Sequence, residues 1–326
     1  MNITVLGAGA WGTALARILA LRGHRVVLWD FFPDAVEAIR ATGRNERYLP
    51  GIELPPGLRA EPDGARAVSD AELVVVAAVS KGFRNVTQTL GGFGGIVVSV
   101  TKGIEIGTGK TMTDILGENA PRARVVAMSG PTLALEVARG VPTAIVAAST
   151  DEAAAQTVQS LFHSPAFRVY TSADVHGVEL GGALKNVIAI GAGVCDGLGF
   201  GDNSKAALVT RAIAELRRLG VACGAQADTF SGLSGMGDLM VTCFSKLSRN
   251  RGFGERLGRG EKAEDIVASM TAVAEGYPTA RSARELARRH GVDTPIMQEV
   301  HAMLHEGKDV RQAVRDLTGR ESKAED

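Results

Sequence analysis

Two lysines stand in apolar surroundings in this sequence, and they are its first pointers to chemistry. Lys102 follows the apolar run at 96–100, where a buried strand should leave a core, and Lys185 with Asn186 interrupts a long apolar stretch. Burying a cation without a partner is costly, so we expect Lys102 to meet an anionic group. We expect Lys185 to be a general acid or base, its pKa lowered from about 10.4 by burial and neighbouring cations. A solvated loop lysine and a lysine that extends to solvent are the respective alternatives.

A phosphate-binding arrangement is predicted further along the chain. Asp238 follows a glycine-rich turn, and Ser248, Arg249 and Asn250 open a helix that includes 250–258. A Ser or Asn N-cap, the backbone N–H groups beyond it and an adjacent Arg would together hold a phosphate. An ordinary capped helix with an exposed arginine is the alternative.

A glycine-rich turn near the start has the GxGxxG spacing of a dinucleotide-binding loop. Its glycines are Gly7, Gly9 and Gly12. An apolar strand at 3–6 precedes the turn, a helix at 13–21 follows it, and a strand at 26–29 ends beside Asp30. In such a unit the glycines permit the turn, the approach of a pyrophosphate and close helix packing, while the helix N-terminus attracts the phosphates. The order of elements favours this function over a purely structural turn.

Asp30 bears on the choice of dinucleotide. A carboxylate at the end of the second strand accepts hydrogen bonds from a ribose 2′-OH and repels a 2′-phosphate. We therefore expect NAD(H) to be preferred, with NADP(H) as a second cofactor.

The remaining pattern predicts the elements that position these residues. Continuous apolar runs, typical of parallel strands covered on both faces, lie at 72–79, 96–102, 124–131 and 143–149. Ligands of such sheets bind at the carboxyl ends of strands, where Lys102, Gly130 and Thr132 lie.

Helical spacing dominates the second half. The segments 204–220 and 279–291 each end in a basic turn and a glycine, Gly220 and Gly291. The predicted fold class is therefore α/β. A Rossmann-like, mostly parallel sheet domain at 1–178 precedes an all-α substrate domain at 179–326, and the tail after Gly319 is predicted to be disordered.

Composition limits the classes of function. Lys plus Arg and Asp plus Glu are both 36, so no net cationic field exists to hold nucleic acid or an anionic membrane. Three widely spaced cysteines form neither a metal-binding pair nor a disulfide framework, which suits a reducing cytosol. No charged leader precedes the first apolar run, and the most apolar later run contains charges. We expect a cytoplasmic protein with no membrane span and no metal.

Longer motifs occur in a fixed order: GAGAWGTALA, TKGIE, SGPTLALEVARGVPTAI, LGGALKNVIAIGAGVCDGLGFGDN, GMGDLMVTC, SRNRGFG and VAEGYPT. Together they resemble the bacterial NAD(P)-dependent glycerol-3-phosphate dehydrogenases over about residues 1–315. The resemblance implies interconversion of sn-glycerol 3-phosphate and dihydroxyacetone phosphate with NAD(P)(H), which supplies phospholipid synthesis. The partner is then a small-molecule substrate, and a homodimer is a common expectation for such enzymes.

The resemblance also implies residue roles. Lys185 matches the proton donor and acceptor, Lys102 touches cofactor and substrate, and Asp238 orients Lys185. Asn186 and Thr242 complete the implied catalytic group. The implied substrate contacts are Lys102, Gly130, Thr132, Lys185, Asp238, Ser248, Arg249 and Asn250. The implied cofactor contacts are Gly7, Gly9, Ala10, Trp11, Gly12, Asp30, Phe31, Lys102, Ala134, Arg249, Val273 and Glu275.

One departure from the family pattern is Phe31, which stands where many relatives carry a basic residue and offers no cation to a 2′-phosphate. In the implied mechanism, protonated Lys185 stabilises the charge that grows on the ketone oxygen and delivers its proton, while Lys102 helps to neutralise the site. Two other hypotheses are a related 3-hydroxyacid or sugar-acid dehydrogenase and a non-catalytic NAD(H)-sensing binding protein. The motif SRNRGFG favours a phosphate over a carboxylate, and Lys102, Lys185 and Asp238 count against a sensor.

Overall fold

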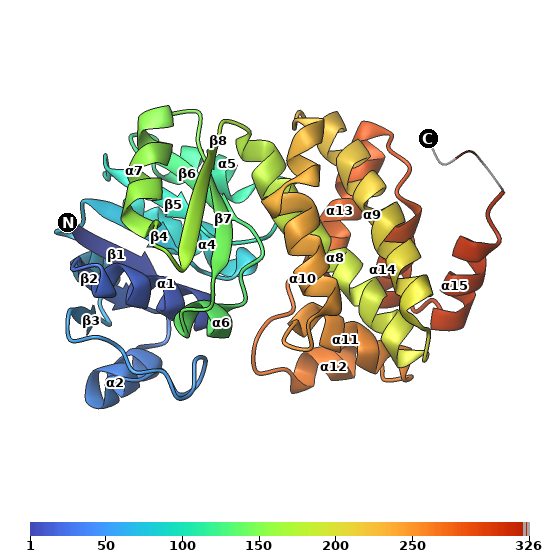
Figure 1. Cartoon of the computed structure of the whole chain (residues 1–326), viewed down its shortest axis with the longest axis horizontal. Coiled ribbons are helices and arrows are strands. Elements are labelled where there is room, and N and C mark those ends of the chain that lie inside the picture. Colours follow the sequence, from blue (N-terminus) through green and yellow to red (C-terminus); the bar gives the residue numbers. More distant parts are fainter. Residues whose placement is uncertain (322–323, 325–326) are drawn as a thin grey trace.

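One eight-stranded sheet forms the first half of the chain, and helices form the second half (Figure 1). The computed structural model describes residues 1–321 and 324, and the predicted disorder after Gly319 falls mainly on residues outside this range. Neighbouring strands are parallel except β6 and β7, which confirms the predicted fold class. The strand order is β3-β2-β1-β4-β5-β6-β7-β8. The strands are β1 (Asn2–Leu6), β2 (Arg25–Trp29), β3 (Leu58–Ala60), β4 (Leu73–Val76), β5 (Ile96–Ser99), β6 (Arg124–Ser129), β7 (Thr143–Ala148) and β8 (Phe167–Ser172).

The central strands are continuous apolar runs because both faces of the sheet are covered. In β4, Leu73 and Val75 pack in the core on one face, while Val74 and Val76 pack in the core on the other. The helices of this half are α1 (Ala10–Leu21), α2 (Pro33–Thr42), α3 (Gly64–Val68), α4 (Ser80–Thr87), α5 (Met112–Asn119), α6 (Ala134–Ala138) and α7 (Glu152–Phe162), with the 3₁₀ turn η1 (Gln88–Leu90).

Two features of the sheet escape the apolar pattern. β3 is a three-residue strand without an apolar run, so nothing in the sequence predicts it. The apolar run at 143–149 predicts a parallel strand, and this is wrong for the pairing of β7 with β6, which is antiparallel, because an apolar run reports burial and not direction.

The second half is built around α8 (Val175–Gly197), in which every residue from Gly177 to Cys195 is buried. The helix is long and apolar enough to cross a membrane, but its most apolar segment is wholly buried inside the protein, as in a core helix. The predicted domain boundary at residue 178 falls inside this helix and stays a prediction. The other elements are α9 (Asp202–Ala222), η2 (Ala227–Ser231), η3 (Leu233–Gly237), α10 (Asp238–Phe244), α11 (Arg249–Gly258), α12 (Ala263–Ser269), α13 (Gly276–His290), α14 (Pro295–His305) and α15 (Val310–Thr318).

Glycines let α11 lie directly against α8. A methyl group on Gly193 would overlap the carbonyl oxygen of Arg251, and one on Gly254 would overlap that of Ile190. This backbone-to-backbone contact fixes the start of α11 relative to Lys185.

Two glycines predicted to end helices behave differently. Gly291 has φ +64° and ends α13 as predicted. Gly220 lies inside α9, which continues to Ala222, so the predicted helix end is wrong. A side chain at Gly220 would overlap the ring of Phe230, so the glycine is needed there for packing.

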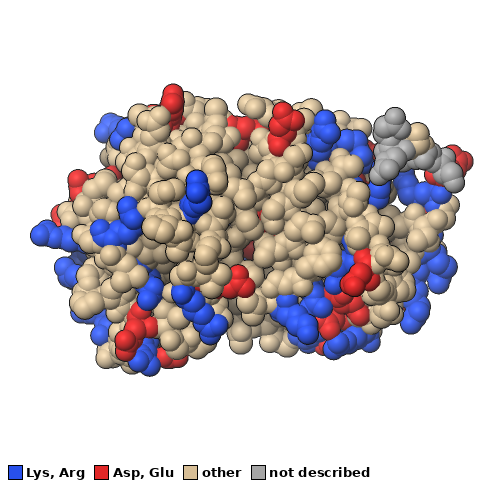
Figure 2. Space-filling model, in the orientation of Figure 1, with Lys and Arg blue, Asp and Glu red and all other residues tan. Residues whose placement is uncertain are grey.

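Hydrogen bonds join the two halves at several points. The backbone N–H of Thr113 donates to Oε1 of Glu179 at 2.9 Å, and its hydroxyl donates to Oε2. Ser282 donates to the carbonyl oxygen of Ile104 at 3.0 Å. Figure 2 shows basic and acidic side chains interspersed over one face of the molecule, with few charges where the two halves meet.

Candidate active site

Lys102 follows β5 at the carboxyl edge of the sheet and meets a carboxylate of the helical half. Its ammonium nitrogen Nζ lies 2.6 Å from Oδ2 of Asp238 and donates to the carbonyl oxygen of Gly130 at 2.9 Å. The hydroxyl oxygen of Thr132 lies 3.4 Å from the same nitrogen. The structure therefore gives Lys102 an anionic partner and brings Gly130 and Thr132, which follow β6, to the same point.

Lys185 reaches the same carboxylate from α8. Its Nζ lies 2.9 Å from Oδ1 of Asp238 and donates to the hydroxyl of Thr242 at 2.6 Å. The residue is 5% exposed, so its ammonium group does not extend to solvent. Burial lowers the pKa of Lys185 to about 8; Asp238 opposes this shift and Lys102 adds to it. Burial is thus a larger cause than the neighbouring cation.

Asp238 begins α10 and is 1% exposed. Thr242, one turn later, donates to the backbone oxygen of Asp238 at 2.7 Å, so its oxygen is left to accept from Lys185. Two lysines and one carboxylate leave one net positive charge, which suits the stabilisation of an oxyanion. An ammonium group whose pKa is about 8 also gives up its proton readily near neutral pH.

Asn186 and Asn250 form a separate buried bridge. Nδ2 of Asn250 donates to Oδ1 of Asn186 at 2.9 Å, and the backbone N–H of Gly276 donates to Oδ1 of Asn250 at 2.9 Å. Asn186 therefore ties the start of α11 to α8, and it is not among the groups that contact Lys185.

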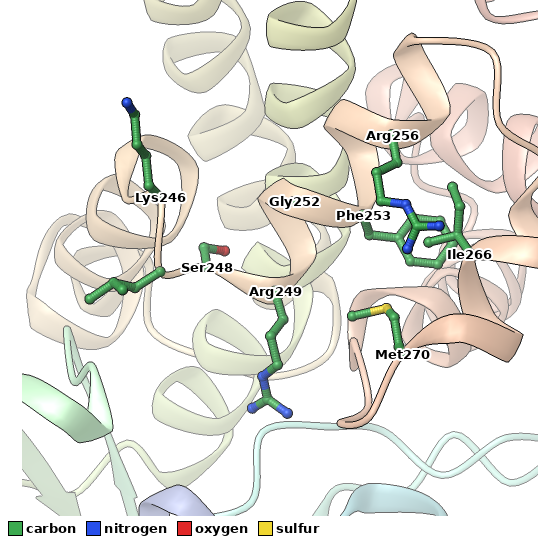
Figure 3. A pocket seen from close by; sticks show the side chains of 9 residues that line it. Lys246, Ser248, Arg249, Gly252, Phe253, Arg256, Ile266 and Met270 are labelled. Carbon is green, nitrogen blue, oxygen red and sulfur yellow. The ribbon is translucent and has the colours of Figure 1, made fainter. Parts of the chain in front are cut away.

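The predicted phosphate end lies at the start of α11. Ser248 is the N-cap, as predicted, and its hydroxyl oxygen accepts from the backbone N–H of Arg251 at 3.2 Å. Arg249 is exposed and donates to the carbonyl oxygen of Val273 at 2.8 Å. Figure 3 shows its side chain extending away from α11 and from Arg256. A cavity of about 270 Å³ adjoins it, lined by Lys246, Leu247, Ser248, Arg249, Gly252, Phe253, Arg256, Ile266 and Met270.

The glycine-rich turn has the shape that a dinucleotide requires. Gly7 has φ +115°, where a side chain would be strained. A methyl group on Gly12 would overlap the carbonyl oxygen of Gly7, so the helix packs tightly on the turn. Around Gly9, by contrast, a methyl group would meet no atom within 4 Å. The turn is therefore open on the side of Gly9, next to the start of α1, which fits a bound pyrophosphate.

Asp30 also supports this turn. Its Oδ2 accepts from the backbone N–H of Ala8 at 2.6 Å, and its Oδ1 accepts from that of Phe32 at 3.1 Å. The rings of Phe31 and Phe32 stand edge to face, 5.5 Å apart, and Phe31 is 62% exposed. The carboxylate is thus fixed at the turn beside an exposed aromatic side chain.

The remaining predicted cofactor contacts are spread over several elements. Ala10 and Trp11 begin α1, and the Trp11 ring lies 6.5 Å from that of Phe167. Ala134 begins α6. Val273 presents its backbone oxygen to Arg249.

Glu275 accepts hydrogen bonds from Ser80, a residue that the sequence analysis does not place near the cofactor. Its Oε1 accepts from the backbone N–H of Ser80 at 3.0 Å, and its Oε2 accepts from the Ser80 hydroxyl at 2.5 Å. Ser80 begins α4, just beyond β4. The rule that ligands bind at the carboxyl ends of strands could have found it.

Comparisons with known proteins agree along the whole chain. Residues 2–155 match the family described as "NAD-dependent glycerol-3-phosphate dehydrogenase N-terminus", and residues 174–315 match its C-terminus. A glycerol-3-phosphate dehydrogenase [NAD(P)+] of Trichlorobacter lovleyi is 52% identical in an alignment that covers 100% of this chain and 99% of the relative. One of Geobacter sulfurreducens is 49% identical, covering 99% and 98%.

Solved structures give the same result. The crystal structure of glycerol-3-phosphate dehydrogenase from Coxiella burnetii superimposes with a TM-score of 0.95 at 36% identity, covering 98% of this chain and 99% of that one. D-mandelate dehydrogenase with NADH, at 16% identity and a TM-score of 0.62, shares the fold alone.

Proposed function

The chain belongs to the NAD-dependent glycerol-3-phosphate dehydrogenase family, and from this membership we infer its reaction. It is an oxidoreductase that interconverts sn-glycerol 3-phosphate and dihydroxyacetone phosphate with NAD(P)(H). The glycerol 3-phosphate that it forms supplies phospholipid synthesis. The main structural support for this reaction is that Lys102 and Lys185, from the two halves of the chain, both form ion pairs with Asp238.

We propose that Lys185 is the proton donor of this reaction. When bound, the nicotinamide dinucleotide supplies the hydride for the ketone carbon and accepts it in reverse. The ketone oxygen then gains negative charge, and Nζ of Lys185 stabilises it and transfers its proton to it. Lys102 adds the second positive charge, and Asp238 holds both ammonium groups in place.

We propose that the start of α11 holds the phosphate of the substrate. The capped helix N-terminus and the guanidinium group of Arg249 both favour an anion there. Asn250 is buried and is bonded to α8 and α13, so this end of the site has a fixed position relative to Lys185. The open side of the glycine-rich turn, at Gly9 and the start of α1, would hold the pyrophosphate of the dinucleotide.

The direct test is the loss of NADH absorbance with dihydroxyacetone phosphate, compared with carboxylated ketones of similar size. We expect turnover of the phosphorylated ketone and little turnover of the others. Turnover of a carboxylated ketone alone would overturn the assignment of the substrate.

A homodimer and a cytoplasmic location are further parts of the proposal. The three cysteines are free, and Cys195 and Cys243 are buried, which suits a reducing compartment. The interspersed surface charges on the face in Figure 2 support a small-molecule partner over nucleic acid. Light scattering on the purified protein and fractionation of cells test these two points.

A further inference from the structure

Asn45 belongs to none of the groups described above, yet its side chain holds the glycine-rich turn. Its Nδ2 donates to the carbonyl oxygen of Ala8 at 2.7 Å and contacts the hydroxyl oxygen of Thr13 at 2.8 Å. Asn45 is 4% exposed, although it comes from the segment after α2 and not from the turn itself. Ala8 is the residue between Gly7 and Gly9.

The segment that carries Asn45 is itself anchored. The backbone N–H of Tyr48 donates to Oδ1 of Asn45 at 3.3 Å, and that of Leu49 donates to its backbone oxygen at 2.8 Å. The Leu49 side chain is buried in a small core with Ala14 and Ala138. The amide group of Asn45 therefore has a fixed place from which to reach the turn.

Because the peptide bond is planar, the hydrogen bond from Asn45 to the Ala8 oxygen also sets the direction of the Gly9 N–H. The carbonyl oxygen of Ala8 and the N–H of Gly9 belong to one planar trans peptide, so they point in opposite directions. Asn45 fixes the oxygen and thereby directs the Gly9 N–H away from itself. Asp30 fixes the preceding peptide through the N–H of Ala8. Two successive peptides of the turn are thus fixed by side chains from two other segments.

We propose that Asn45 is a positioning residue of the dinucleotide site, which keeps the peptide between Ala8 and Gly9 from rotating. Glycine allows such a rotation at low cost because it has no Cβ. A rotated peptide would present a carbonyl oxygen to the phosphates in place of an N–H donor, and affinity would fall. This inference rests on the proposed use of a dinucleotide.

The chain offers a matched control for this role. Asn119 donates from Nδ2 to the carbonyl oxygen of Arg84 and to the hydroxyl of Thr87, both at 2.8 Å. It therefore makes the same two kinds of hydrogen bond in the same half of the chain, but to α4 instead of the glycine-rich turn. Asn45→Ala and Asn119→Ala remove equivalent bonds, and only the first should affect the dinucleotide.

The experiment is a fluorescence titration of each full-length variant with NADH, together with KM for NADH, kcat and the melting temperature. We expect Asn45→Ala to raise Kd and KM for NADH about tenfold with kcat within about twofold, and Asn119→Ala to change neither constant. Thr13→Val leaves Asn45 in place and removes only a hydroxyl that also contacts the carbonyl oxygen of Ala8, at 3.2 Å. It should raise Kd about two- to threefold, which keeps the test open if Asn45→Ala does not fold.

The outcomes separate the inference from the function on which it rests. If Asn45→Ala binds NADH as well as the wild type does, the positioning role is wrong and the proposed function stands. If Asn45→Ala does not fold, the same conclusion follows from unchanged NADH affinity in Thr13→Val. Equal losses of affinity in Asn45→Ala and Asn119→Ala would also overturn the role. A wild type that binds no NADH would overturn the proposed function and this inference with it.

Discussion

Lys102 and Lys185 come from opposite halves of the chain, and the two oxygens of Asp238 hold them, at 2.6 Å and 2.9 Å. Neither half alone contains the site, because the sheet supplies one ammonium group and the helices supply the other with the carboxylate. Removing one partner of a buried ion pair costs about 3–5 kcal/mol because the other charge is left buried and uncompensated, so each half depends on the other to neutralise its charges.

Lys185→Ala should lower kcat by about 10²–10⁴-fold, the usual contribution of a positioned general acid. The affinity for NADH should change little, because Lys185 contacts Asp238 and Thr242 and not the glycine-rich turn. Steady-state kinetics and an NADH titration measure both. Lys205→Met is the matched control, since Lys205 is also buried and pairs with Asp196, outside the site. Near-normal turnover of Lys185→Ala would remove it from the mechanism.

The pH dependence should follow the protonation of Lys185. Its pKa of about 8 lies below the usual value, so the acid form required for ketone reduction is lost as pH rises through 8. Above that point kcat/KM for reduction, which reports the free enzyme, should fall about tenfold per pH unit, while kcat/KM for alcohol oxidation should rise through the same range.

Asp238→Asn tests the origin of this profile. The carboxylate raises the pKa of Lys185, so its removal should move the midpoints of the reduction and oxidation profiles to lower pH. The variant should also lose most of its kcat. Stopped-flow measurements of NADH oxidation at a series of pH values give the midpoints. Identical midpoints in the variant and the wild type would assign the profile to another group.

Arg249→Ala should raise KM for dihydroxyacetone phosphate about 10–100-fold, because a hydrogen bond to a charged group contributes about 1.5–3 kcal/mol. Initial rates over a range of substrate concentrations measure this. Arg259→Ala is the control, since that side chain is 63% exposed and pairs with Glu255 on the same helix. An unchanged KM in Arg249→Ala would place the phosphate elsewhere.

Asp30 should make the enzyme prefer NADH. Two like unit charges about 4 Å apart repel by about 4 kcal/mol at an effective dielectric constant of about 20, and a quarter of that gives about fivefold discrimination. Asp30→Asn retains an oxygen that can accept from the N–H of Ala8 and removes the charge. The ratio of kcat/KM for NADH to that for NADPH should therefore exceed one in the wild type and fall about fivefold in the variant. A wild type that prefers NADPH would exclude this role.

The sequence predicts what depends on local pattern. The apolar runs locate β4 and β5, and strand-end reasoning finds Lys102. Pattern does not reveal contacts between distant segments, so it could not show that Asp238 serves both lysines. It missed Asn45 for the same reason, because that residue lies 37 positions from Ala8 in the chain. Gly220 shows the converse error, in which a local helix-stop signal is overridden by the packing of Phe230.

Glu215 should make the stability of the helical half depend on pH. It is 2% exposed and caps α14, accepting from the backbone N–H groups of Ile296 and Met297 at 2.8 and 3.2 Å. Burial raises its pKa from 4.5 to about 7, despite these two bonds. The folded protein therefore holds this proton more tightly than the unfolded chain. Stability from this group is fully present below pH 4.5 and is lost as pH rises to 7.

The free energy of unfolding should fall by about 3 kcal/mol across this window through Glu215 alone, at about 1.4 kcal/mol per pKa unit. Glu215→Gln cannot ionise and should remove that part of the slope, although it loses one acceptor and is less stable at low pH. Burial raises the pKa of Glu179 as well, so the comparison is between variant and wild type. Denaturant midpoints at a series of pH values between 4.5 and 7.5 measure the slope. Glu285→Gln is the control, since Glu285 is only partly buried and pairs with Arg289. Parallel slopes in Glu215→Gln and the wild type would show that folding does not raise the pKa of Glu215.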